Sequence, residues 1–259
     1  MKIKTPTLVP IPLEFKIACA TYDLHIPEIL QLFIDHVSFY DSLSQKSDDL
    51  YRSATNTLLN YSISIRRETS TSFLKQREPI LKYIREVIRI ATTPAQTHTK
   101  KRKMCVPIVK KIYQMMDRTI TRDTTLILDE GITLQLKMDF CLLCELHNCT
   151  PEEYLEHFMS QISLPKTHAN LGLKRVVENQ AMGFFYKSLN INKAKPSISA
   201  HRYLQVQFID RIQELHLWLF IIRSYEKRVE KYEELYDQYY YQLLDAHKKQ
   251  NDLKKQPNT

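Results

Sequence analysis

Glycine is almost missing from this chain: only three of its 259 residues are glycine. Average proteins contain roughly 7% glycine, and glycine supplies the positive φ angles that tight turns, bulges and phosphate-binding loops require. Apolar residues make up 43% of the chain, which is enough to bury a sizeable core. The sequence therefore predicts a folded, mainly α protein with few β-hairpins, and several glycine-dependent catalytic motifs are excluded.

Apolar residues recur at steps of three and four along much of the chain, which is the spacing of one helix face. The expected helices cover about residues 27–43, 48–61, 80–91 and, after Pro107, 108–120. The segment 92–99 has no periodicity, so we expect a loop there that leads directly into the basic run Lys100–Lys103.

Positive charge is concentrated in one window. Eight of the 37 Lys and Arg residues lie between His98 and Arg122, where Asp117 is the only acid, so this window carries +7 of the formal net charge of +8. Outside it, 29 bases face 28 acids. The bases are Lys100, Lys101, Arg102, Lys103, Lys110, Lys111, Arg118 and Arg122. Two interpretations stay open: a solvated helix face with a loop end, or a surface that binds nucleic acid or another polyanion.

The apolar spacing changes from about 3.6 to two after Arg122, where apolar residues alternate with polar ones over 132–138. This pattern predicts a half-buried strand. The β-prone run Thr125–Leu128 precedes it, and Asp129–Gly131 suits a three-residue hairpin loop with glycine at the left-handed position.

Two short helices are expected after this strand. The first runs from Asp139 to about Asn148. Thr150 and Glu153 then have the spacing of a capping box, which predicts a second helix that ends near Leu164 and Pro165.

The order of strand, short helix, tight turn and second helix over Thr133–Ser163 resembles the ribbon-helix-helix family of DNA-binding modules, across about an eighth of the chain. The resemblance implies that a strand paired between two chains places Thr133, Gln135 and Lys137 in the major groove, and that amides near Thr150 hold a phosphate. Two other interpretations stay open: a helix-turn-helix with the hairpin as a wing, and a purely structural element.

Four residues form the one grouping in the sequence with the side chains that zinc prefers: Cys141, Cys144, His147 and Cys149. A structural zinc site usually takes its two ligand pairs from separated segments, whereas Cys141 and Cys144 lie one turn apart on an apolar helix. Buried thiols are therefore the favoured interpretation, and no metal or cofactor is expected. No catalytic signature is present either, so we expect a protein that is not an enzyme.

The segment from His201 to Lys249 contains neither proline nor glycine, and its apolar residues follow a near-heptad pattern. The members are Leu204, Phe208, Leu215, Trp218, Ile222, Tyr225, Val229, Tyr232, Tyr236, Tyr239 and Leu243. This predicts one helix of about 48 residues and roughly 70 Å. Its first half, around Leu215–Ile222, is expected to be buried, and its narrow tyrosine stripe to pack against a second copy or against helices of the same chain.

The expected organisation is an N-terminal helical region (1–97), a basic and hairpin region (98–165) and a C-terminal helical region (166–259). We expect a DNA-binding regulator or accessory factor, and the C-terminal helix leaves open a homodimer through its stripe or packing within the same chain. The alternative is a helical scaffold or adaptor that acts through coiled-coil contacts. No apolar run reaches the roughly 18 residues of a membrane span, so we expect a cytoplasmic protein with no membrane partner.

Overall fold

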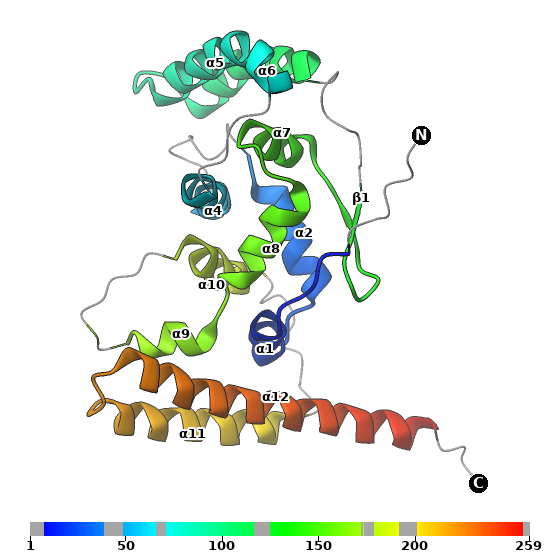
Figure 1. The fold of residues 1–259 in the computed structure, drawn as a ribbon, viewed down its shortest axis with the longest axis vertical. Coiled ribbons are helices and arrows are strands. Elements are labelled where there is room, and N and C mark those ends of the chain that lie inside the picture. The colour runs from blue at the N-terminus through cyan, green and yellow to red at the C-terminus, as the bar shows by residue number, and fades with distance from the viewer. Residues whose placement is uncertain are drawn as a thin grey trace. The chain divides into compact units, whose positions relative to one another are not determined.

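The computed structural model describes residues 8–38, 49–65, 71–116, 125–171, 173, 179–191 and 201–255. These residues are mainly helical, with one two-stranded antiparallel sheet and a long C-terminal helix (Figure 1), which confirms the predicted fold class. The chain forms two compact units. Unit 1 comprises residues 1–11, 26–161 and 179–191, and unit 2 comprises residues 12–25, 162–178 and 192–259.

Unit 1 contains the sheet and most of the shorter helices. Its elements are α2 (Ile26–His36), α4 (Asp49–Ile65), α5 (Thr71–Thr92), α6 (His98–Met116), β1 (Thr125–Ile127), β2 (Thr133–Gln135), α7 (Met138–Leu146), α8 (Pro151–Ser160) and α10 (Gln180–Ile191). The described ends of these helices differ from the expected ones most at α5 and α6, which begin earlier than the apolar spacing indicates.

Aromatic side chains from three helices form the core of unit 1. Phe33 of α2 stacks on Phe158 of α8 with ring centroids 3.7 Å apart, and the ring of Phe184 from α10 meets Phe33 edge-on at 5.2 Å. Tyr154 of α8 is fully buried, and its hydroxyl donates to the carbonyl of Ala54 in α4 at 2.6 Å. Because a buried hydroxyl without an acceptor is costly, this bond fixes α8 against α4.

The hairpin forms as the turn residues predict. Gly131 has φ of 71°, and β1 pairs with β2 so that Thr125 faces Gln135 and Ile127 faces Thr133. On the other side, Val9 forms a parallel bridge with Leu128. The strand therefore pairs within its own chain, and the pairing between two chains that the ribbon-helix-helix resemblance implies is not the one observed.

The capping box at α8 is confirmed, because the Thr150 hydroxyl accepts from the Glu153 amide while the Glu153 carboxylate accepts from the Thr150 amide. The expected end of this helix is wrong in detail. Pro165 does not terminate α8 but lies in the first turn of a further helix, α9 (Leu164–Ala169), which Ser163 caps by accepting from the Lys166 amide. Proline is favoured there because the first-turn amides of a helix lack internal partners.

The expected loop before the basic run is shorter than predicted, and α6 continues through Pro107. The helix begins at His98, where the Thr97 hydroxyl accepts from the Lys100 amide at 3.4 Å. Its buried face runs on across the proline through Cys105, Ile108 and Ile112. Tertiary packing of this face therefore offsets the hydrogen bond that an internal proline removes.

Unit 2 contains α1 (Leu13–Thr21), α9, α11 (Arg202–Leu219) and α12 (Tyr225–Lys255). A long C-terminal helix is present as α12, with 31 residues. The single helix expected from His201 to Lys249 is wrong, because α11 ends at Leu219 and the chain turns back before Tyr225.

The helices α11 and α12 pack against each other as an antiparallel hairpin. Phe208 stacks on Tyr239 with centroids 4.2 Å apart, and His216 Nδ1 lies 3.1 Å from the Tyr232 hydroxyl. Tyr236 also contacts His168 of α9. The tyrosine stripe is thus buried by helices of the same chain, which is one of the two arrangements that the heptad pattern left open. Among the described residues, no helix has both the length and the apolar character that a bilayer crossing requires.

Candidate nucleic-acid interface

The exposed side of α6 carries five of the predicted basic residues: Lys100, Arg102, Lys103, Lys110 and Lys111. The opposite side of the helix packs on α5, where Cys105 and Ile108 join Val87 and Ile90 in one cluster. Because the buried face is fixed by these contacts, the five cations are held on the solvent side of a single rigid element.

Lys101 does not belong to this surface. Its side chain is buried, and its ammonium donates to the carbonyl of Ala91 at 2.8 Å. Ala91 lies in the last turn of α5, where carbonyl groups lack internal partners and the helix dipole is negative. The phosphate contact predicted for Lys101 is therefore wrong, and its cation joins the end of α5 to the start of α6.

Arg118 and Arg122 cannot be placed with the others, because residues 117–124 lie outside the described part of the chain.

The structure adds bases that the sequence analysis missed. Lys82, Arg85 and Arg89 are exposed on α5 and follow the spacing of one helix face, opposite the buried Val87. The same spacing was visible in the sequence, but it lies outside the window of concentrated charge. Two acids of α5, Glu78 and Glu86, are also exposed. The two helices lie side by side (Figure 1) and together form a basic surface, which we call the α5–α6 surface.

Contacts within the pair tie the two helices together near these charges. The ammonium of Lys111 lies 5.9 Å from the ring centroid of Tyr83, a cation–π distance that connects α6 to α5. Burial, assisted by the nearby Glu86 carboxylate, raises the pKa of the Cys105 thiol. Cys105 is therefore a protonated packing residue beneath the surface.

The three proposed base-reading residues lie on or beside β2. Thr133 and Gln135 are exposed, on the same face of the hairpin as Thr125 and Ile127. The side chain of Gln31 holds the backbone of Gln135 through two hydrogen bonds of 2.9 and 3.0 Å. Lys137 follows the strand, and its ammonium lies 2.9 Å from the Asp35 carboxylate. This ion pair reduces the charge that Lys137 offers to a phosphate or a base.

No protein-family model, curated protein or solved structure matches this chain.

The cysteine and histidine cluster has the character of a packing site. Cys144 and Cys149 are buried, and the Cys149 thiol donates to the Cys144 carbonyl at 3.6 Å. Burial is the main cause that raises the pKa of Cys144 well above its ordinary value, and burial also raises the pKa of Cys141. A buried thiol with a raised pKa behaves as a small apolar packing residue. Within the described residues, no three His, Cys, Asp or Glu side chains are grouped to hold a metal ion.

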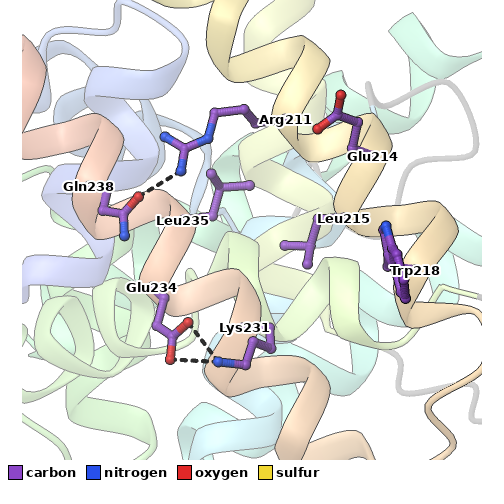
Figure 2. A pocket seen from close by; sticks show the side chains of 8 residues that line it. All are labelled: Arg211, Glu214, Leu215, Trp218, Lys231, Glu234, Leu235 and Gln238. Atoms are coloured by element: carbon purple, nitrogen blue, oxygen red, sulfur yellow. Dashed lines mark hydrogen bonds and ion pairs between the residues drawn. The ribbon is translucent and has the colours of Figure 1, made fainter.

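A groove of about 280 Å³ lies between α11 and α12 (Figure 2). Arg211 and Gln238 are joined across it by a hydrogen bond of 2.9 Å, and Lys231 forms an ion pair of 2.8 Å with Glu234. These polar groups of the groove satisfy one another, so the groove adds no separate argument for a ligand.

Proposed function

We propose that this chain is a non-enzymatic, cytoplasmic DNA-binding protein, a regulator or accessory factor that contacts phosphates through the α5–α6 surface. The observation that supports this most is the display of Lys100, Arg102, Lys103, Lys110 and Lys111 on the solvent side of one helix. Lys82, Arg85 and Arg89 extend the surface onto α5.

The dimensions of this surface fit a nucleic-acid backbone. From Lys100 to Lys111 the helix rises about 16 Å. Over that length a duplex carries about ten phosphate charges. Binding that neutralises about five phosphates is driven by counterion release, so its affinity falls several-hundredfold between about 50 and about 200 mM salt.

Specificity would come from a different element. Thr133 and Gln135 present hydroxyl and amide groups on an exposed strand face, and such groups read base edges in the major groove. Phosphate contacts by the α5–α6 surface would give affinity, whereas these two side chains would give sequence preference.

Fluorescence anisotropy with labelled random duplex and single strands at two salt concentrations tests the proposal. Replacement of Arg102, Lys103, Lys110 and Lys111 by glutamine should lower affinity by at least a hundredfold and remove most of the salt dependence. Replacement of Thr133 and Gln135 by alanine should leave the salt dependence unchanged and reduce discrimination between duplex sequences.

The matched control replaces four exposed lysines of α12 by glutamine, namely Lys227, Lys231, Lys248 and Lys249. This variant changes the net charge by the same amount and should retain most of the affinity. Equal losses in both variants would mean that only overall charge matters. An affinity that does not change with salt concentration, or the absence of binding, would contradict the proposed function.

A further inference from the structure

The outer face of α11 exposes large apolar side chains that the sequence analysis expected to be buried. Leu217 and Phe220 are 74% and 79% exposed, and Val206 and Ile209 are about half exposed. The expectation fails because Leu204, Phe208 and Leu219 already form the buried face of this helix. The helix α11 is therefore apolar on two sides, one of which packs on α12 while the other faces solvent.

These exposed residues follow the spacing of a helix-packing face. At 3.6 residues per turn, one side of α11, about opposite Phe208, carries Val206, Ile209, Gln213 and Leu217. Phe220, the C-cap residue, keeps helical backbone angles and continues this side. The groove of Figure 2 lies on a different flank of the helix, where Arg211 and Trp218 are found. The face is thus a separate surface from the groove.

The chemistry of this face is symmetric about Gln213. If a second α11 lies antiparallel on it, with the twofold axis at Gln213, the facing pairs are Val206 with Phe220 and Ile209 with Leu217. Each of these four apolar residues then faces an apolar residue, and Gln213 meets its own copy across the axis. A surface that is complementary to itself in this way is what a twofold homodimer requires.

The area of the face sets the strength of such an interface. Together with the neighbouring Tyr203 and Ile221, which are also exposed, the apolar and polar side chains can bury on the order of 600 Å² per copy. This is about 1,200 Å² in total, the lower edge of the range for specific interfaces. The area therefore fits a reversible dimer whose population rises with protein concentration.

We infer that a second copy of this chain covers the α11 face and that the protein forms an antiparallel homodimer centred on Gln213. A lipid surface fits the face less well, because Asp210 and Gln213 lie in the middle of it and would have to enter the apolar phase. The inference does not depend on nucleic-acid binding, although a dimer would present two α5–α6 surfaces.

Light scattering coupled to size-exclusion chromatography, without nucleic acid, tests the inference over a wide range of concentrations. The wild-type mass should rise from 30.7 kDa toward twice that value. Leu217→Glu should keep the protein monomeric, because the new carboxylate would face Ile209 of the other copy. The control Ile63→Glu changes a side chain that is 73% exposed on α4 and should dimerise like the wild type.

A charge-swap variant tests the predicted pairing itself. Ile209→Lys alone should also abolish the dimer, whereas Ile209→Lys combined with Leu217→Glu should restore it, because each new ammonium would face the other copy's new carboxylate. A wild-type protein that stays monomeric throughout overturns the inference. The inference is also overturned if Leu217→Glu still forms dimers. The same holds if the double variant stays monomeric although circular dichroism shows that it is folded. Vesicle binding that requires Leu217, by a monomer, would identify a lipid surface as the occupant instead.

Discussion

At the scale of single residues, the sequence locates the charge but not its orientation. Four consecutive residues sweep about 300° around a helix. A run such as Lys100–Lys103 therefore must send one side chain toward the packed face once the run is helical. The expectation that the helix begins only after Pro107 concealed this consequence, and Lys101 is the buried member. The capping function of Thr150, by contrast, depends only on local spacing and was predictable.

Lys101 and Lys103 should behave in opposite ways when each is replaced by methionine. Lys101→Met removes the ammonium that donates to the Ala91 carbonyl, so the free energy of unfolding should fall by about 1–3 kcal/mol. Lys103→Met removes only an exposed charge and should change stability by less than about 0.5 kcal/mol. Urea denaturation measures both effects.

Fluorescence anisotropy titrations at low salt measure the DNA affinity of the same two variants. Lys103→Met should weaken binding to duplex DNA severalfold, and Lys101→Met should leave the affinity close to that of the wild type. If Lys101→Met weakened binding while its stability stayed unchanged, the structural role of Lys101 would be refuted.

At the scale of elements, local signals were reliable and long-range ones were not. Gly131 fixes its turn through its own backbone, so the hairpin could be predicted. The near-heptad pattern after His201 specifies an apolar seam, but the same pattern results from one long helix and from two helices that fold back on each other. No glycine or proline marks the turn before Tyr225, so the sequence offered no signal for it.

Proline at position 107 should cost α6 stability, because it removes the hydrogen bond to the carbonyl four residues earlier. Pro107 is exposed, so Pro107→Ala loses little packing. We expect the free energy of unfolding to rise by about 1–2 kcal/mol, since an internal proline costs about 3 kcal/mol in a helix and its restriction of the unfolded chain returns about 1 kcal/mol. Thermal and urea denaturation monitored by circular dichroism measure this change.

Pro94→Ala is the matched control for this prediction. Pro94 is exposed in the turn between α5 and α6, where proline restricts the unfolded chain without removing a helical hydrogen bond. Pro94→Ala should therefore lower stability slightly, by about 0.5–1 kcal/mol. A loss of stability in Pro107→Ala would show that the proline ring makes a contribution that its exposure does not reveal.

At the scale of the whole molecule, the two units are built from interleaved segments. The three expected regions follow one another along the chain, whereas each compact unit takes three separate segments. Unit 2 brings distant segments into contact, as in the 3.0 Å ion pair between Lys166 and Glu14, which are 152 residues apart. Spacing in a sequence reports on neighbours along one element, so pairings at this separation could not be predicted.

This interleaving predicts that the α11–α12 hairpin is not an independent folding unit. In the intact chain, the buried Tyr232 and Tyr236 contact His168 of α9, and α1 also packs on α12. A fragment of residues 201–255 lacks both partners, so its tyrosine stripe would be partly exposed. It should be partly helical but should unfold without a cooperative transition.

A single chain that joins residues 12–25, 162–171 and 201–255 through flexible linkers should recover cooperative unfolding, because it restores the buried face of α12. Circular dichroism during urea titration separates the two outcomes, and His168→Ala in the joined chain should lower its midpoint. A fragment of residues 201–255 that unfolds as cooperatively as the joined chain would show that α9 and α1 are not needed for the fold of unit 2.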